Sequence, residues 1–398
     1  MVQVKDLTER TLEERWSEVK DEEEWWDEIK PRTLNAVKVL MESAMESEMI
    51  DELLAARYRR TEFRRGYRNG YRYRSLLTDL GPIERIRIPR DREGHYQTEV
   101  VRKYQRRQAR VNEMVREMFL AGVSTRRVRE VIKPLLGQGV SPQTVSRICR
   151  SLDEEVQRYH SRELDDRYRY LLLDGIVLRV KGAAEVKRRV VLCAYGVTHD
   201  GVRELIDFRQ AYSEGTTMWT GFLDNLYRRG LTGDNLELIS TDGAAGLHSA
   251  LDHVYPFVPR QRCWAHKMRN VAAKLPRKHQ DACLSEAKTI YQANTRREAL
   301  LRFRQWAAHW RSIAPNAVRC IENDLDELLP FLDCPQEHWK KVRTTNAIER
   351  AFREVRRRTR PMSCFQNSAS VERIIFGVIS HLNTNWKDAP LLQFTHKS

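Results

Sequence analysis

Residues 168–180 read YRYLLLDGIVLRV, an apolar run that carries one acid, Asp174, near its middle. An apolar run bounded by charged residues is typical of a buried β-strand. Residues 186–212 read VKRRVVLCAYGVTHDGVRELIDFRQAY and predict two further strands, joined at Asp200–Gly201, a dipeptide that favours a tight hairpin turn. These residues therefore predict a sheet that begins with three consecutive strands.

Helices and strands alternate in the residues that follow. The pattern predicts a helix over 216–230, a strand, turn and helix over 235–254, and a short strand leading into a helix over 258–275. This is the element order of a ribonuclease-H-like α/β core, although other α/β folds share much of it. Residues 275–340 have helical patterns and no strand signal, which predicts an all-helical insertion into that core.

Two acids lie within or at the end of apolar strands. Asp174 follows three leucines in the first strand, and Asp242 ends the fourth strand, LELISTDG. A carboxylate buried there without a partner costs several kcal/mol, so it requires a partner or a metal. Because the first strand of a ribonuclease-H-like sheet lies beside the fourth, we expect the two acids to converge. Gly175 and Gly243 follow them and leave backbone room beside a bulky ligand.

A third acid, Glu349, lies in residues 343–361, RTTNAIERAFREVRRRTRP. On a helix, one side of this segment is apolar and should face the core, with Ile348, Ala351, Phe352 and Val355. The neighbouring side carries Glu349 and a row of arginines, namely Arg353, Arg356, Arg357 and Arg360. The pattern favours an acid that holds a metal beside arginines that bind the phosphates of a polyanion.

Three converging carboxylates would bind hard divalent cations through oxygen, with two Mg²⁺ or Mn²⁺ ions expected. Two such ions, about 4 Å apart, can activate an attacking hydroxyl and stabilise the leaving oxygen in phosphoryl transfer. Each acid also has a purely structural alternative. Asp174 could lie at a β-bulge, Asp242 could cap the next helix, and Glu349 could pair with Arg353.

The charge of the chain indicates an anionic partner. The 398 residues have a formal net charge of +15, and residues 51–150 hold 24 Lys and Arg against 11 Asp and Glu. A block this rich in arginine favours nucleic acid over a membrane surface. There is no apolar run of membrane-spanning length and no signal peptide, and the seven cysteines are scattered, so we expect a cytoplasmic, nucleoid-associated protein with no membrane partner.

Two N-terminal regions precede the helix-turn-helix pattern of the sequence. Residues 1–56 predict helices suited to self-association, and residues 57–110 predict a basic, Arg/Tyr-rich element with a hairpin turn at Gly81–Pro82. Arginine neutralises phosphates, and aromatic rings can stack on bases. The DNA contacts expected from this element are Arg64, Arg65, Arg68, Arg72 and Arg74.

Residues 111–165 predict a helix-turn-helix DNA-binding domain. Ser124 can cap a helix that carries Arg126 and Arg127, and Ser141 can cap the next helix. The front of that helix holds the residues expected to contact DNA bases: Gln143, Thr144, Ser146 and Arg147. The remaining boundaries place the first part of the core at 166–274, the insertion at 275–340 and the final core helices at 341–398.

Several motifs together resemble one family. They are GYRNGYRYRSLLTDLGPIERIRIPRDREG, STRRVREVIKPLL with SPQTVSRI, LLLDGI, STDGAAGLHSAL, QRCWAHKMRN and TTNAIERAFREVRRRTRPM. The chain resembles bacterial insertion-sequence transposases of the Mutator-related group, which use a DDE triad. The resemblance places the triad at Asp174, Asp242 and Glu349 and the C-x-x-H signature of the group at Cys263 and His266. Asn346 and Arg350 flank the final acid as in the family pattern.

The resemblance implies an activity as well as a fold. It implies a ribonuclease-H-like core with an all-helical insertion between the second Asp and the Glu. It also implies Mg²⁺-dependent cleavage and strand transfer of double-stranded DNA at terminal inverted repeats, with joining to target DNA, by a homodimer or higher homo-oligomer.

Other functions stay open on the residues alone. His266, Arg269 and Tyr291 are loosely compatible with a tyrosine recombinase, and the helix-turn-helix with a non-enzymatic DNA-binding regulator. A ribonuclease-H-like nuclease without strand transfer is a further alternative. Cys263 and His266 form half of a zinc site, and the sequence offers no convincing second half.

Overall fold

The computed structural model describes residues 22–181, 186–360, 365, 367–391 and 394. The predicted helices over 1–56 therefore lie partly outside the described residues. Contacts within the chain define two compact units, residues 1–119 with 124–148, and residues 120–123 with 149–398. The chain is a mixed α/β protein, as the sequence predicts. None of the helices in the described part has the length and apolar character needed to cross a lipid bilayer.

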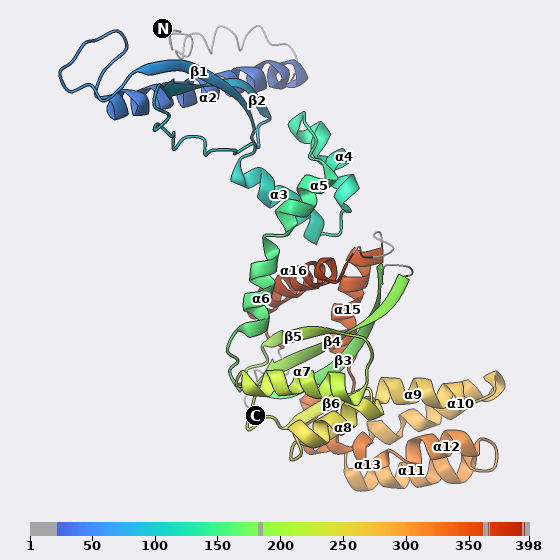
Figure 1. Cartoon of the computed structure of the whole chain (residues 1–398). Helices are drawn as coiled ribbons and strands as arrows, with labels where there is room; N and C mark the ends of the chain where they lie inside the picture. Colours follow the sequence, from blue (N-terminus) through green and yellow to red (C-terminus); the bar gives the residue numbers. More distant parts are fainter. Residues whose placement is uncertain (1–21, 182–185, 361–364, 366, 392–393, 395–398) are drawn as a thin grey trace. The chain divides into compact units, whose positions relative to one another are not determined.

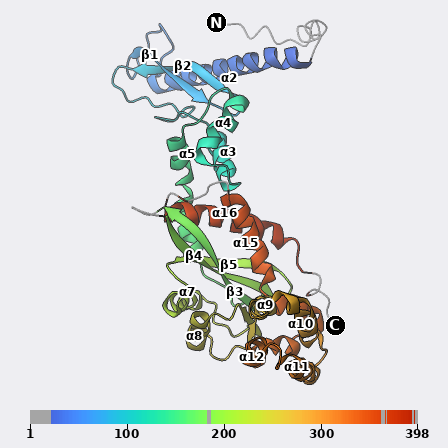
Figure 2. The ribbon, with the colours of Figure 1, turned by 90° about the vertical axis from the view of Figure 1, so that its right-hand side faces the viewer.

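In the first unit, a long helix packs along a two-stranded hairpin (Figures 1 and 2). These elements are α2 (Glu22–Leu53), β1 (Arg68–Leu77) and β2 (Pro82–Asp91), the two strands being antiparallel. Because side chains alternate along a strand, one face of β2 is apolar and packs on α2. The core between them includes Met45, Ile83, Ile86 and Ile88, all buried. At its edge Arg87 donates a 2.7 Å hydrogen bond to Glu42.

Three short helices follow in the same unit. They are α3 (Ala109–Leu120), α4 (Thr125–Leu136) and α5 (Pro142–Cys149). The predicted caps are present, since Ser124 Oγ accepts from the N–H of Arg127 at 3.4 Å and Ser141 Oγ accepts from that of Thr144 at 3.2 Å. Gly137 ends α4 with a φ of 71°, a left-handed conformation that glycine adopts without strain.

The second unit is built on a five-stranded mixed sheet with the strand order β5-β4-β3-β6-β7. The strands are β3 (Tyr168–Lys181), β4 (Val186–Thr198), β5 (Arg203–Ala211), β6 (Leu238–Thr241) and β7 (Arg260–Arg262). β4 pairs antiparallel with both β3 and β5, whereas β6 pairs parallel with β3 and with β7. The predicted turn at Asp200–Gly201 joins β4 to β5, with Gly201 at a φ of 75°.

Helices cover both faces of this sheet (Figure 1). One face carries α7 (Thr216–Arg228) and α8 (Ala245–Val254). The other face carries α15 (Asn346–Thr359), α16 (Ser368–Lys387) and α6 (Leu152–Ser161). Since successive residues of a strand point to opposite faces, Leu173 and Leu192 pack under α7, while Ile176 and Cys193 lie under α15 and α16. Asp174 shares the face of Ile176.

Residues 264–342 form helices between the last strand and α15. In chain order they are α9 (Trp264–Ala273), α10 (Arg277–Lys288), η2 (Ile290–Gln292), α11 (Arg296–Trp310), α12 (Pro315–Glu322), α13 (Leu325–Leu328), η3 (Pro330–Asp333), η4 (Gln336–His338) and α14 (Trp339–Val342). Tryptophans join them, because Trp306 Nε1 donates to the carbonyl of Cys283 at 3.2 Å and Trp310 Nε1 donates to Glu286 at 2.8 Å.

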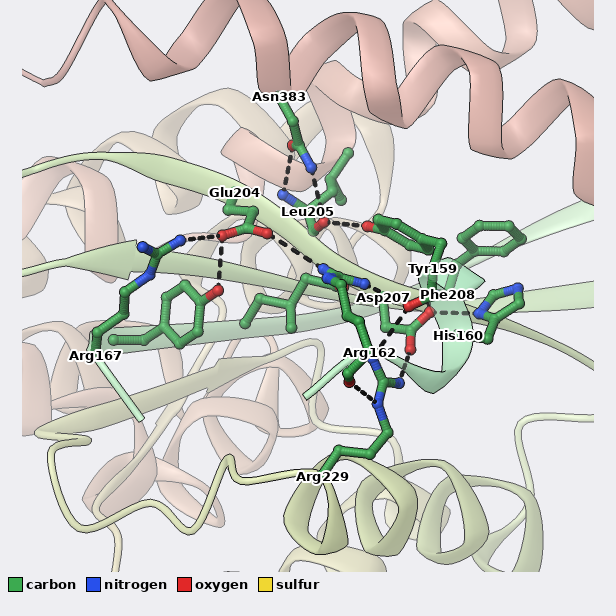
Figure 3. A network of polar contacts seen from close by, with 12 residues as sticks. Tyr159, His160, Arg162, Arg167, Glu204, Leu205, Asp207, Phe208, Arg229 and Asn383 are labelled. Carbon is green, nitrogen blue, oxygen red and sulfur yellow. Dashed lines mark hydrogen bonds and ion pairs between the residues drawn. The ribbon is translucent and has the colours of Figure 1, made fainter. Parts of the chain in front are cut away.

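A polar network fixes α6 to the edge strand β5 (Figure 3). Asp207 of β5 is only 2% exposed, and it forms an ion pair with Arg229 and a 2.7 Å hydrogen bond with His160 Nδ1. Nearby, Arg162 contacts Glu204 at 3.2 Å. A buried carboxylate is stable only when its charge is compensated, so this network attaches the start of the unit firmly to the sheet.

Candidate metal centre

Asp174 lies in β3 on the face that α15 covers. It pairs with Cys193 of β4 in unbroken register, so no β-bulge places it there. Asp174 is 7% exposed, and its Oδ1 accepts a 2.8 Å hydrogen bond from the N–H of Gly175. Within the described part of the chain, its second oxygen accepts no hydrogen bond. The carboxylate is therefore buried with unused ligand capacity.

Asp242 lies one residue beyond β6, on the strand next to Asp174. Leu173 pairs with Thr241 in the parallel register, so each acid directly follows a paired residue at the same level of the sheet. Neighbouring strands are about 4.8 Å apart, which brings the backbone of the two acids close together. Oδ1 of Asp242 accepts a 2.9 Å hydrogen bond from the N–H of Ala244 and so fixes the turn before α8.

Glu349 extends from the first turn of α15 toward α9. Its Oε1 accepts a 2.7 Å hydrogen bond from Arg269 Nη2 and lies 3.4 Å from His266 Nε2. Both partners belong to α9, so the carboxylate is held between two helices that are distant in sequence. The ion pair of Glu349 is therefore with Arg269 and not with Arg353 on its own helix.

Asp174, His266 and Glu349 form a group whose candidate ligand atoms all lie within 4.8 Å of one another. Asp242 is not a member of that group. Burial raises the pKa of Asp174 to about 7, although the Gly175 hydrogen bond and His266 lower it; Asp242 and Glu349 add to the rise. Asp242 thus lies near enough to act on Asp174 electrostatically. A divalent cation would offset this concentration of negative charge.

The donor atoms in this group suit a hard or borderline divalent cation. Carboxylate oxygens are the preferred ligands of Mg²⁺, and Mn²⁺ also accepts imidazole. The unused oxygen of Asp174 is available to such an ion, and Glu349, whose Oε1 accepts from Arg269, lies beside it with His266. The arrangement can therefore hold a metal beside an open, arginine-bearing helix surface.

Cys263 and His266 contact each other, and both contact Thr345. The Cys263 sulfur accepts from the N–H of Thr345 at 3.3 Å, and Thr345 Oγ1 lies 3.4 Å from His266 Nδ1. A side-chain hydrogen bond with Cys263 is the main cause that raises the pKa of His266. Trp264 is 1% exposed and donates to the carbonyl of Leu328 at 2.7 Å, so it packs in the core. These contacts orient the His266 ring toward Glu349.

Two neighbours of the centre were not anticipated from the sequence. The sequence links Arg269 only to a recombinase pattern, although Arg269 lies one helical turn after His266 and so on the same side of α9. Glu214, in the loop before α7, lies beside Gly175, where a Cβ would come within 2.6 Å of its Oε1. Burial and the nearby Asp242 raise the pKa of Glu214. Only the helical spacing of Arg269 offered a signal in the sequence.

Asn346 and Arg350 lie on the flank of α15 next to the one that carries Glu349. Both line a pocket of about 530 Å³ together with Arg353. Consecutive helical residues are about 100° apart, so Arg350 cannot share the direction of Glu349. The structure thus brings His266 to the acids but places Asn346 and Arg350 elsewhere.

The other arginines of α15 differ in their partners. Arg356 and Arg360 are exposed. Arg357 and Arg358 both contact Glu354, at 3.0 Å and 2.6 Å. Arg356 and Arg360 therefore keep their charge available to an external anion on the Glu349 side.

The arginines predicted on the hairpin are partly engaged within the first unit. Arg68 pairs with Glu46 at 2.7 Å, and the guanidinium of Arg64 lies 4.6 Å from the centre of the Tyr67 ring. Arg65 is exposed, whereas Arg72 is partly buried.

The hairpin and the front of α5 share a pocket in this unit. Its volume is about 450 Å³, and Arg74 and Thr144 are among its lining residues. Gln143 and Arg147 are exposed on α5, Ser146 is partly buried, and Arg126 and Arg127 are exposed on α4. The predicted contact residues of α4 and α5 thus include four with exposed side chains.

Comparison with known proteins identifies similar chains over most of the length. A family model described as the transposase of the Mutator family matches residues 7–389. The chain is 35% identical over 353 residues to the transposase for insertion sequence element ISRM5 of Rhizobium meliloti, which covers 89% of this chain and 88% of the relative. It is 32% identical to the transposase for IS256 in transposon Tn4001 of Staphylococcus aureus, over 88% of this chain and 90% of the relative. It is also 31% identical to the transposase for IS905 of Lactococcus lactis, over 79% and 80%.

Proposed function

Because this chain belongs to the Mutator family of transposases, we propose that it binds the terminal inverted repeats of its insertion sequence and catalyses metal-dependent cleavage and strand transfer of DNA. The observation that carries the proposal is the group formed by Asp174, His266 and Glu349, with Asp242 on the adjacent strand. The strand order, with β6 parallel beside β3, supports a ribonuclease-H-like core.

Asp174, Asp242 and Glu349 are proposed to hold the metal, Mg²⁺ or Mn²⁺. When bound, two such ions supply a Lewis acid for the scissile phosphate and an activated attacking hydroxyl. The protein positions the reacting strand. Arg356 and Arg360, exposed on the Glu349 side of α15, are suited to bind the phosphates that flank the reacting group. His266 and Arg269 contact the Glu349 carboxylate from α9 in the metal-free protein.

We propose that the first unit binds the ends of the insertion sequence. Its hairpin carries arginines beside exposed tyrosines, a combination suited to phosphate contacts. Helix α5 is capped by Ser141 and presents Gln143 and Arg147 to solvent at its front, as a groove-reading helix requires. We therefore propose a helix-turn-helix in which α5 reads bases.

The test separates chemistry from binding. Asp242→Asn and Glu349→Gln should abolish cleavage and joining while the affinity for a duplex of the element end is unchanged. Asp281→Asn, which removes the same charge from the exposed surface of α10, is the matched control. Products with Mg²⁺ are resolved on a sequencing gel and binding by gel retardation. Full activity in either active-site variant would overturn the proposal.

A tyrosine recombinase would instead require Tyr291 as nucleophile. Its ring packs against Trp264, with centroids 5.0 Å apart, and lies under the Arg343 guanidinium at 4.7 Å. Those contacts give Tyr291 a role in packing the helical region on α9. Tyr291→Phe should therefore keep activity, and a covalent protein–DNA adduct in the wild type would favour the recombinase.

A further inference from the structure

A second cationic site lies in the second unit, on the flank of α15 next to the one that carries Glu349. It is the pocket of about 530 Å³ that Asn346 and Arg350 line. Residues from β4, β5, α14, α15 and α16 line it, so both the sheet and the neighbouring helices contribute. Pockets of about 300–1,000 Å³ are typical of sites for small ligands. We call it the α15 pocket.

Positive charge in the α15 pocket is not compensated from within. The cationic side chains that line it are Arg203, Lys340, Lys341, Arg350 and Arg353. Glu354 is the one carboxylate in the lining, and Arg357 and Arg358 already pair with it. In the described part of the chain, Lys340, Lys341, Arg350 and Arg353 form no hydrogen bond or ion pair.

The cations are close enough to repel one another. Burial lowers the pKa of Lys341, and Arg350, Arg203 and Lys340 lower it further. Arg203 also has a buried Nε with no hydrogen-bond partner among the described residues. Like charges assembled around one carboxylate that is already paired destabilise the free protein, whereas a bound anion would relieve the repulsion.

Aromatic rings form the other part of the lining. Tyr195, Trp386 and Phe394 contribute, with the Tyr195 and Trp386 rings in an edge-to-face contact at 5.6 Å. Tyr195 is only 2% exposed, so most of its ring is covered by the protein. Trp386 is partly exposed, and the Arg203 guanidinium lies 5.3 Å from the centre of its ring, so this part of the lining combines aromatic surface with positive charge.

We propose that the α15 pocket binds one nucleotide unit of single-stranded DNA, with its phosphate on Lys340, Lys341 and Arg350 and its base against the aromatic lining. Phosphate alone would not need the rings, and an apolar ligand would not need the cations. A duplex is too wide for a pocket of this size, so the occupant is an unpaired nucleotide. The inference rests on the proposed function, since strand cleavage and transfer expose unpaired DNA beside Glu349.

Crosslinking locates the bound strand directly. A short single-stranded oligonucleotide with 5-iododeoxyuridine is irradiated with the full-length protein, and the adducts are mapped by mass spectrometry. We expect adducts at Tyr195, Trp386 or Phe394. Adducts found only outside the pocket would overturn the proposal. Competition with inorganic phosphate and with a free deoxynucleoside monophosphate shows whether a free anion binds the pocket better than a strand does. Stronger binding of phosphate or of the monophosphate than of the strand would also overturn the proposal.

Variants test the two halves of the site. Lys341→Gln should reduce the salt slope of single-strand binding by about 0.7, the effect of one lost phosphate contact, whereas Lys341→Arg should restore it. Lys288→Gln, on the exposed surface of α10, is the matched control and should leave the slope unchanged. Trp386→Ala should weaken binding about fivefold or more, and less for a strand without bases. An unchanged slope in a Lys341→Gln protein that melts like the wild type would contradict the proposal.

The outcome is independent of the cleavage assay. Crosslinking is done with chelator present, so it does not depend on the metal or on chemistry. If cleavage fails while the pocket adducts form, the proposed function is wrong and the pocket inference stands. If cleavage and joining proceed while no pocket adduct forms, the pocket inference alone is wrong.

Discussion

Arg269 of α9 donates a 2.7 Å hydrogen bond to Glu349 of α15, two residues that are 80 positions apart in the chain. The guanidinium places a positive charge on the carboxylate that is proposed to hold a metal cation. His266 lies 3.4 Å from the same oxygen. The metal and the α9 side chains therefore compete for Glu349, and the affinity for metal should depend on that competition.

Arg269→Gln should strengthen metal binding, because it removes a cation from the centre. The pair is partly exposed, so the expected gain is roughly two- to fivefold in Kd for Mn²⁺. The measurement is isothermal titration with Mn²⁺ in the absence of DNA. Arg277→Gln, an exposed arginine on α10, removes equal charge away from the centre and should have no effect. Weaker Mn²⁺ binding in Arg269→Gln would show that Arg269 instead supports the site.

Asp174 should make the metal-free protein less stable as the pH rises. Its pKa is about 7 in the folded protein, mainly through burial, against an ordinary value of 3.8. Between these values the folded state binds more protons than the unfolded state, so the free energy of unfolding falls with rising pH. The loss is on the order of 4 kcal/mol once the pH exceeds 7.

Urea unfolding with chelator tests this dependence. The wild type and Asp174→Asn should differ little near pH 4 and most at pH 8, where the variant should be the more stable protein. Excess Mg²⁺ at pH 8 should recover the stability of the wild type alone, since the ion favours the ionised carboxylate. A variant that is less stable than the wild type at pH 8 would mean that Asp174 is paired in the metal-free state.

Arg356 and Arg358 should differ in their effect on DNA binding although both lie on α15. Arg356 is exposed, whereas Arg358 pairs with Glu354 at 2.6 Å. Arg356→Ala should reduce the salt slope of duplex binding by about 0.9, the effect of one lost phosphate contact. Arg358→Ala should leave the slope nearly unchanged. Equal slopes in the two variants would remove Arg356 from the DNA path.

The core of the second unit was predictable because its signals are local. The apolar run around Asp174 predicted β3, the Asp200–Gly201 turn predicted the β4–β5 hairpin, and helical spacing predicted the buried side of α15. The expected adjacency of the first and fourth strands is present, with Leu173 paired to Thr241. The position of Asp242 beside Asp174 follows from that register.

Contacts between distant helices were not predictable in the same way. The pairing of Glu349 with Arg269 depends on how α9 docks on α15, which no local pattern encodes. Glu214 reaches the centre from a loop, and loops carry no periodicity. Arg350 is adjacent to Glu349 in sequence, yet the helix turns it toward the α15 pocket. That last placement could have been predicted from the 100° step of the helix.

Base recognition by α5 should be separable from phosphate contact by α4. Gln143 and Arg147 are exposed, one helical turn apart, and so can both enter a groove. A bidentate contact contributes about 1–3 kcal/mol of discrimination, so Gln143→Ala or Arg147→Ala should reduce the preference for the element end by about 5- to 150-fold at one or two base pairs. Arg126→Ala should instead weaken binding to all sequences alike. The preference is measured by selection from a library of duplexes in which the end sequence is randomised. An unchanged preference in both α5 variants would show that a different helix or strand contacts the bases.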